Sequence, residues 1–278
     1  MHYLTFVFCV FFLQSCSTKT STVKVKGSDT EVNLAVLLAE SFHQKNNSLL
    51  VSISGGGSGL GIASLLNGTA DIANSSRRIN EGEMLLFKEK NIELDSFIFA
   101  QDAIAFVVSN TLPIDSIGVS DLSKILNGEY KDWSHLLQEN IPINIYGRQS
   151  NSGTYEFVKD ILNIHFSPYA KQMNGNAQIL EAIKADNSGI GYVGAGYVKM
   201  GDSKEIKVLK IYTDNQPSIS PLDSAKIASG EYFFQRPLFQ YYKKSDYEKV
   251  KPFLDFEKTE RGTAIINASG YYPIKKVK

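Results

Sequence analysis

The sequence predicts an α/β protein made of two lobes, with mainly parallel sheets flanked by helices. Three observations predict it. Strand-like and helix-like stretches alternate along the first part of the chain, with short turns between them. Two strongly β-prone passages, residues 103–108 and 232–242, lie far apart and suit strands that run between lobes. At 278 residues and 43% hydrophobic composition, the chain can bury one or two cores.

The first elements follow from the spacing of apolar residues. Residues 22–26 alternate apolar and polar side chains, as a half-buried strand does. Three-to-four spacing in the next segment predicts a helix whose buried face carries Val32, Val36, Ala39 and Phe42. Further along, strand patterns occur at 49–54, 71–73 and 143–146, and helix patterns at 62–66, 81–90 and from Tyr155 onward.

The two β-prone passages divide the chain into a discontinuous lobe and a continuous one. If both passages run from one lobe to the other, residues 22–103 and 232–278 form lobe one, and residues 104–231 form lobe two. No internal repeat or low-complexity run is evident in either part. The two crossing segments would then act as the hinge about which the lobes close.

The N-terminus has the features of a bacterial lipoprotein signal. Residues 1–14 contain no Asp, Glu, Lys or Arg. Their apolar run is shorter than the ~20 residues of a membrane-spanning helix. Residues 13–16, Leu-Gln-Ser-Cys, are similar to a lipobox, which predicts a signal peptide at 1–15, lipidation of Cys16 and a tether at 16–21. The alternative is an ordinary signal peptide. The protein is expected in the cell envelope, anchored by the lipid and facing the periplasm or the exterior.

Composition and charge exclude several classes of protein. Lys plus Arg and Asp plus Glu number 29 each, and a net charge of zero is not typical of a nucleic-acid-binding protein. A small anion stays open as a ligand, since backbone dipoles and one or two arginines can hold one. The two cysteines, Cys9 and Cys16, lie at the N-terminus, so no disulfide or thiolate site is expected in the mature body.

No catalytic or metal-binding motif is recognisable. Residues 56–60 lack the last glycine of a Gly-x-Ser-x-Gly nucleophile elbow, and no Gly-Lys-Ser/Thr follows them as in a P-loop. His43, His135 and His165 fall in or near predicted helices with no motif around them. The sequence therefore predicts no enzyme activity and no metal or cofactor.

Four loops of small and hydroxylated residues lie between a predicted strand and the next helix. They are residues 27–30 (Gly-Ser-Asp-Thr), 55–59 (Gly-Gly-Gly-Ser-Gly), 75–78 (Ser-Ser-Arg-Arg) and 150–154 (Ser-Asn-Ser-Gly-Thr). The first N–H groups of a helix lack an intrahelical partner and, with the helix dipole, form an anion site. Hydroxyl groups add donors. One such loop is usually a cap or a turn, but four in both lobes predict that an anion binds where they meet.

The order and spacing of these loops resemble the phosphate-binding proteins of ABC-type phosphate transporters. The resemblance covers nearly all of the mature chain, through residues 27–30, 57–59, 68–77, 122–133 and 148–154. It implies the periplasmic-binding-protein-like fold of type II, in which two α/β lobes close over a ligand in the inter-lobe cleft. It also implies a monomer that binds inorganic phosphate and delivers it to the membrane permease of an ABC-type phosphate transporter.

Carried over position by position, the resemblance places phosphate contacts in all four loops. They fall on Ser28, Asp29, Thr30, Ser58, Ser76, Arg148, Ser152, Gly153 and Thr154. Arg148 would make the main charge-assisted hydrogen bonds, because a guanidinium fork matches phosphate oxygens. Arg77 could add charge from lobe one, and the alternative for Arg77 is a solvated residue at the start of a helix.

One position departs from the best-known members, which have an aspartate where this sequence has Ser76. Phosphate carries a proton that needs an acceptor, and sulfate does not. Asp29 is the candidate acceptor, and the alternative for Asp29 is an N-cap of the following helix. Two further functions stay open, because oxyanions of similar size would use the same donors and because the cleft itself could be unused. One is a binder or sensor of molybdate, tungstate or sulfate on the same scaffold, and the other is a surface adhesin with a vestigial cleft.

Overall fold

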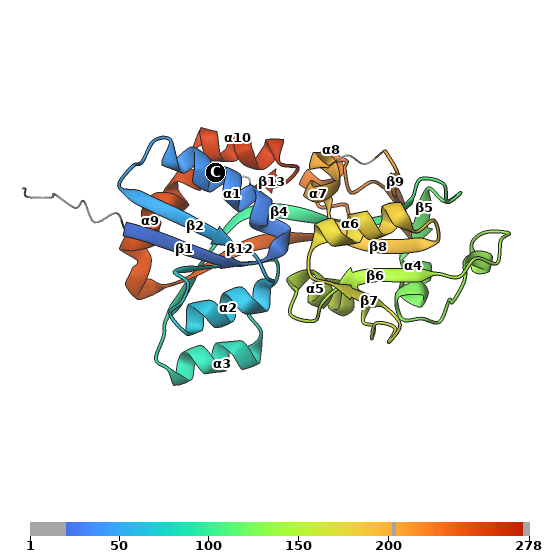
Figure 1. Ribbon diagram of the computed structural model, residues 1–278, viewed down its shortest axis with the longest axis horizontal. Coiled ribbons are helices and arrows are strands. Elements are labelled where there is room, and N and C mark those ends of the chain that lie inside the picture. The colour runs from blue at the N-terminus through green and yellow to red at the C-terminus, as the bar shows by residue number, and fades with distance from the viewer. Residues whose placement is uncertain (1–20, 202–203, 275–278) are drawn as a thin grey trace, which may run out of the picture.

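Two α/β lobes lie side by side and are joined by two long strands (Figure 1). The computed structural model describes residues 21–201 and 204–274, so the predicted signal peptide and Cys16 lie outside the described residues. Strand β4 (Leu94–Ser109) passes from lobe one into lobe two, and β12 (Gln235–Lys243) pairs with it in the opposite direction. The passages at 103–108 and 232–242 thus fall on or next to these two connecting strands. No helix in the described part of the chain is both long and apolar enough to cross a bilayer.

Lobe one is a sheet covered by helices on both faces. Its strand order is β2-β1-β3-β12-β4, and β1 begins at Ser21, inside the predicted tether. Leu34 and Phe253 belong to the core on one face, and Ile62 and Phe87 belong to the core on the other. The remaining bounds are β1 (Ser21–Gly27), β2 (Leu49–Ser54), β3 (Ile72–Ser75), α1 (Val32–His43), α2 (Ser58–Leu66), α3 (Glu81–Glu89), α9 (Tyr247–Glu257) and α10 (Glu260–Ala268).

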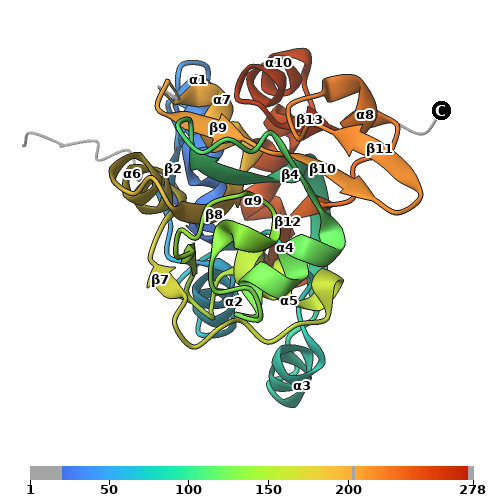
Figure 2. The same ribbon diagram turned by 90° about the vertical axis from the view of Figure 1, so that its right-hand side faces the viewer.

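Lobe two continues the sheet in the order β4-β8-β6-β7, around a core that contains Phe106, Trp133 and Tyr192. Seen end on, it shows α4 in front and strands β10 and β11 to one side (Figure 2), and these two strands form a separate three-stranded sheet with β5 in the order β11-β10-β5. Its strands are β5 (Ser116–Gly118), β6 (Asn144–Arg148), β7 (Lys171–Met173), β8 (Gly189–Gly194), β9 (Ile206–Val208), β10 (Lys210–Thr213) and β11 (Gln216–Ile219). Its helices are α4 (Val119–Leu126), α5 (Gly153–Leu162), α6 (Asn176–Ala185), α7 (Ala195–Met200) and α8 (Ser224–Ala228). Four short elements remain. Strand β13 (Tyr272–Pro273) pairs with β4, and the 3-10 turns are η1 (Asp29–Glu31), η2 (Trp133–His135) and η3 (Lys244–Asp246).

The sheet is mixed, because the two connecting strands, β4 and β12, run antiparallel to their neighbours. β1 is parallel to β2 and β3, and β6 is parallel to β7 and β8, as strand–helix alternation predicts. By contrast, β4 and β12 are antiparallel to each other, and they are also antiparallel to β8 and β3. The two-lobed α/β fold is therefore confirmed, with an antiparallel centre that the expectation of mainly parallel sheets leaves out.

Some local predictions differ from the structure. The buried face of α1 carries Leu34, Leu38 and Phe42, whereas Val36 is 37% exposed, so its predicted burial is wrong. The helix is apolar on most sides, and spacing alone therefore does not select its buried face. Helix α2 begins at Ser58, within the second loop itself, and α5 likewise begins two residues before Tyr155. The loop residues consequently supply the first N–H groups of these helices.

Candidate anion-binding site

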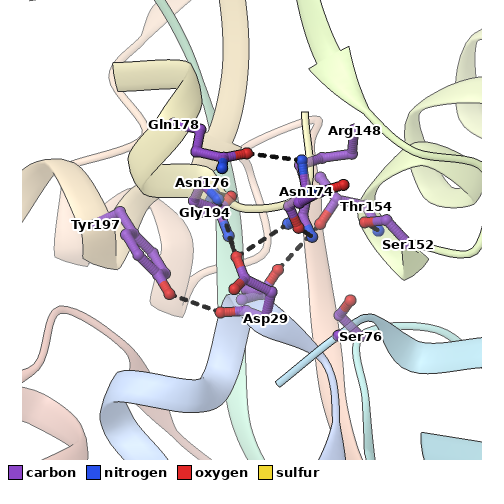
Figure 3. Close-up of polar contacts among 12 residues, drawn as sticks. Asp29, Ser76, Arg148, Ser152, Thr154, Asn174, Asn176, Gln178, Gly194 and Tyr197 are labelled. Carbon is purple, nitrogen blue, oxygen red and sulfur yellow. Dashed lines mark hydrogen bonds and ion pairs between the residues drawn. The ribbon is translucent and has the colours of Figure 1, made fainter. Parts of the chain in front are cut away.

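The four predicted loops meet where the two lobes face each other (Figure 3). Lobe one contributes the loop after β1, the start of α2 and the loop after β3. Lobe two contributes the end of β6 and the start of α5. The structure thus brings the predicted site residues together. Those that are at least 97% buried are Ser28, Thr30, Ser58, Ser76, Arg148, Ser152 and Thr154.

Hydroxyl groups form two close pairs at this boundary. Thr30 Oγ1 of lobe one lies 3.0 Å from Thr154 Oγ1 of lobe two. Within lobe one, Ser58 Oγ lies 3.4 Å from Ser76 Oγ and accepts a hydrogen bond from the Ser76 N–H at 3.1 Å. A Cβ on Gly153 would lie 2.5 Å from the Ser58 Oγ and 2.6 Å from the Ser76 Oγ. Only glycine therefore lets the start of α5 approach this pair so closely.

Arg148 is a buried cation, and some of its N–H groups have no acceptor within the described residues. Its Nη2 donates to the Asn174 carbonyl at 2.9 Å, and its Nη1 lies 3.3 Å from Asp29 Oδ2. Neither Nε nor Nη1 makes a hydrogen bond within the described residues. Burial lowers the pKa of Arg148 below its ordinary value, and the nearby Asp29 carboxylate opposes that effect. Unpaired buried N–H groups are rare in proteins, so this guanidinium fits a site that receives an anion.

Asp29 joins the two lobes. Its Oδ2 accepts hydrogen bonds from the Asn176 backbone N–H at 2.9 Å and from Asn176 Nδ2 at 2.8 Å, so it caps α6 of the opposite lobe. The Tyr197 hydroxyl donates to the Asp29 carbonyl at 2.7 Å. The alternative that Asp29 is an N-cap of the following helix is wrong, because its side chain accepts no hydrogen bond from the turn or helix that follows it. Oδ1 has no hydrogen-bond partner within the described residues and keeps its capacity as an acceptor.

Arg77 is held between two carboxylates. Its Nη1 and Nη2 donate to Glu83 at 2.7 and 2.8 Å, and its Nε lies 2.6 Å from Glu156 Oε2 in the opposite lobe. The side chain is only 9% exposed, so the solvated alternative is wrong. Burial acts to lower the pKa of Arg77, but the Glu83 carboxylate outweighs it and raises that pKa. These partners make Arg77 an inter-lobe contact, and a ligand contact by Arg77 stays a prediction.

Sequence reasoning missed Asn176 and Arg236. Asn176 opens α6 after the short Asn174-Gly175 turn, a fifth strand-to-helix loop that has a glycine but no hydroxylated residue. Arg236 lies in β12, donates through Nε and Nη2 to Asp102 Oδ2 at 3.2 and 3.0 Å, and also reaches the threonine pair. One feature of the sequence could have indicated a role for Arg236: it is the one charged residue in the passage 232–242.

The chemistry of the site is that of oxyanion binding. It combines hydroxyl donors, two helix N-termini and a guanidinium in a place shielded from water. No group of three or more His, Cys, Asp or Glu side chains in the described part of the chain could hold a metal ion.

Comparisons with known proteins agree on one family. The chain matches the PBP superfamily domain over residues 14–258. It is 28% identical to the phosphate-binding protein PstS of Borreliella burgdorferi, covering 98% of each chain, and 28% identical to protein SphX of Synechococcus elongatus, covering 89% of this chain and 76% of the relative. A structure from Clostridium perfringens, described as a phosphate ABC transporter substrate-binding protein with bound phosphate, has a TM-score of 0.81 at 22% identity. The match covers 92% of this chain and 100% of that one. At this identity the structural likeness shows the fold.

Proposed function

This chain belongs to the PBP superfamily, and we propose that it binds inorganic phosphate outside the cytoplasmic membrane and delivers it to an ABC-type phosphate permease. One observation carries the proposal. Arg148 is buried with two nitrogens that make no hydrogen bond within the described residues, at the same lobe boundary where hydroxyl groups of both lobes meet (Figure 3). The Borreliella burgdorferi relative is named for phosphate binding, which supports a transport role without enzyme activity.

The proposed phosphate contacts come from the loops of both lobes. Arg148 supplies charge-assisted hydrogen bonds through Nε and Nη1. The start of α5 supplies backbone N–H groups and the positive end of the helix dipole. The full proposed set is Ser28, Asp29, Thr30, Ser58, Ser76, Arg148, Ser152, Gly153 and Thr154, with Arg77 at its edge.

Ligand binding and lobe closure are coupled in this proposal. An anion bound to one lobe recruits donors from the other, and its binding energy shifts the balance toward the closed form. Contacts such as Asp29–Asn176 and Arg77–Glu156 then form across the boundary. The closed monomer would dock on the permease.

We also propose that the mature chain is anchored by a lipid at Cys16, at the periplasmic or extracellular face of a membrane. Mass spectrometry of the mature N-terminus tests this. The expected result is an N-terminal cysteine that carries the mass of lipid. An unmodified residue at that position would remove the anchor and leave the binding function untouched.

Selectivity for phosphate depends on an acceptor for its proton. Asp29 Oδ1 is free to accept within the described residues, whereas Ser76 occupies the aspartate position of the best-known relatives. A competition titration with phosphate, sulfate and molybdate therefore separates phosphate transport from the binding of another oxyanion. The proposal requires phosphate to bind in the micromolar range or tighter and to win the competition.

Arg148→Ala tests the site by isothermal titration calorimetry. Two charge-assisted hydrogen bonds of about 1.5–3 kcal/mol each predict a loss of phosphate affinity of roughly 100-fold or more. Arg261→Gln, which changes an exposed arginine of α10, is the matched control and should bind like the wild type. Unchanged affinity in a folded Arg148→Ala variant would show that the cleft does not bind the anion in this way.

A further inference from the structure

Arg236 is placed on the hinge and not on any anion loop. It lies opposite Asp102 in the register of β12 against β4, the two strands that join the lobes. Both side chains are at least 98% buried, and Arg236 donates to Asp102 Oδ2 through Nε at 3.2 Å and Nη2 at 3.0 Å. The carboxylate thus fixes the guanidinium at the point where the lobes meet.

The same guanidinium reaches one threonine of each lobe. Its Nη2 lies 3.2 Å from Thr30 Oγ1 in lobe one and 2.9 Å from Thr154 Oγ1 in lobe two. The two hydroxyl oxygens are also 3.0 Å apart. Arg236 therefore holds both hydroxyl groups only when the lobes are in contact.

Donor and acceptor chemistry fixes the direction of these hydroxyl hydrogens. A guanidinium only donates, so both hydroxyl oxygens must act as its acceptors. Each threonine hydroxyl has one hydrogen, and one of the two lies in the bond between Thr30 and Thr154. The other hydrogen has no acceptor within the described residues and is left for a ligand.

We propose that Arg236 is a positioning residue for the anion: held by Asp102 on the hinge, it orients the Thr30–Thr154 hydroxyl pair so that the one hydrogen not shared between them is donated to the ligand when the lobes close. This inference deepens the proposed function and rests on it, because it concerns how the same site recognises its oxyanion. It predicts energetic coupling between Arg236 and Thr154 in binding, which a purely structural role of the arginine would not produce.

The test is a double-mutant cycle measured by calorimetry with inorganic phosphate. Because Arg236→Gln alone would leave Asp102 buried without its cation, the background is Arg236→Gln with Asp102→Asn, in which both charges are removed together. Circular dichroism and thermal melting establish that each variant is folded, and Arg236→Lys serves as a second variant that keeps the ion pair but lacks the fork.

In the wild-type background, Thr154→Val should weaken phosphate binding by about tenfold, the loss of one good hydrogen bond. In the background without Arg236 and Asp102, the same change should weaken it less than about threefold, since the hydroxyl is no longer oriented. Ser76→Ala is the control, because Ser76 pairs with Ser58 and not with Arg236, and its effect should be equal in both backgrounds.

Two outcomes would overturn the inference. One is an additive cycle, in which Thr154→Val has the same effect with and without Arg236. The other is wild-type affinity in both the Arg236→Lys variant and the paired variant. A wild-type protein that binds no phosphate would instead refute the proposed function, so the two failures are distinguishable.

Discussion

Glu257 is buried, and replacing it by glutamine should change how the free energy of unfolding depends on pH. It is 1% exposed, at the end of α9 beneath the sheet of lobe one. Gln240 Nε2 donates to its Oε1 at 3.0 Å, while Glu257 Oε2 and Gln240 Oε1 have no partner within the described residues. Burial raises the pKa of Glu257 from 4.5 to about 8, against the opposing effect of the Gln240 hydrogen bond. The carboxyl is therefore mostly protonated at neutral pH.

The free energy of unfolding depends on pH because the pKa of Glu257 differs between the folded and unfolded states. Because the pKa is higher in the folded state, the contribution to the free energy of unfolding is complete below pH 4.5 and is lost as the pH rises through 8. The pKa difference of about 3.5 corresponds to roughly 5 kcal/mol at 1.36 kcal/mol per pH unit. Glu257→Gln removes this titration and supplies a permanent N–H donor to the unpaired Gln240 oxygen. The variant should match the wild type near pH 5 and be more stable by several kcal/mol at pH 9.

Urea unfolding at pH 5, 7 and 9 measures this difference, with fluorescence of the fully buried Trp133 and circular dichroism as probes. Burial also raises the pKa of Glu31, and the Glu257 carboxylate adds a smaller increase, so the Glu31 contribution to the pH dependence is shared only in part by the two proteins. Glu248→Gln, an exposed position of the same helix, should follow the wild-type curve. Parallel curves for Glu257→Gln and the wild type across this pH range would refute the reasoning.

Two further predictions concern the cleft. Gly153→Ala places a methyl group within 2.6 Å of two serine hydroxyls, so phosphate affinity measured by calorimetry should fall by at least about tenfold while thermal stability changes little. Equal affinity would show that the start of α5 does not approach Ser58 and Ser76 in the bound form. Glu156→Gln removes the ion pair with Arg77 across the lobes, which should lower affinity by up to about fivefold and less so at high salt. Small-angle scattering of the unliganded variant should show a larger radius of gyration, and an unchanged radius would contradict a closing role.

The anion loops could be predicted from sequence because their chemistry is local. Glycine and hydroxylated residues between a strand and a helix determine a βα turn wherever it occurs, and Ser58 and Gly153 begin helices within such turns. The buried face of α1 could be predicted only in part: Ala39 and Phe42 are buried as predicted, but Val36 is exposed, since this helix carries apolar side chains on nearly every side. There the sheet and the neighbouring helices select the face, and both are assembled from distant parts of the chain.

The roles of the charged residues could not be predicted for a related reason. Arg236 and Asp102 are separated by 134 residues and meet through strand register. Asp29 caps a helix that begins 147 residues later. Sequence spacing gave Asp29 a local N-cap as an alternative because local capping is the commoner use of an aspartate there, and only the contact between lobes decides against it.

The three arginines of the cleft all have carboxylate neighbours, and this determines how an anion would be held. Arg148 lies beside Asp29, Arg236 is bonded to Asp102, and Arg77 is bonded to two glutamates. Each positive charge already has a carboxylate partner, so the cleft carries little excess charge, in keeping with the net charge of zero. Attraction to an oxyanion must then come from directed N–H and O–H donors, which act over hydrogen-bond distances. Such a site selects by shape and by hydrogen-bonding capacity, and its donors complete their geometry only when both lobes contribute.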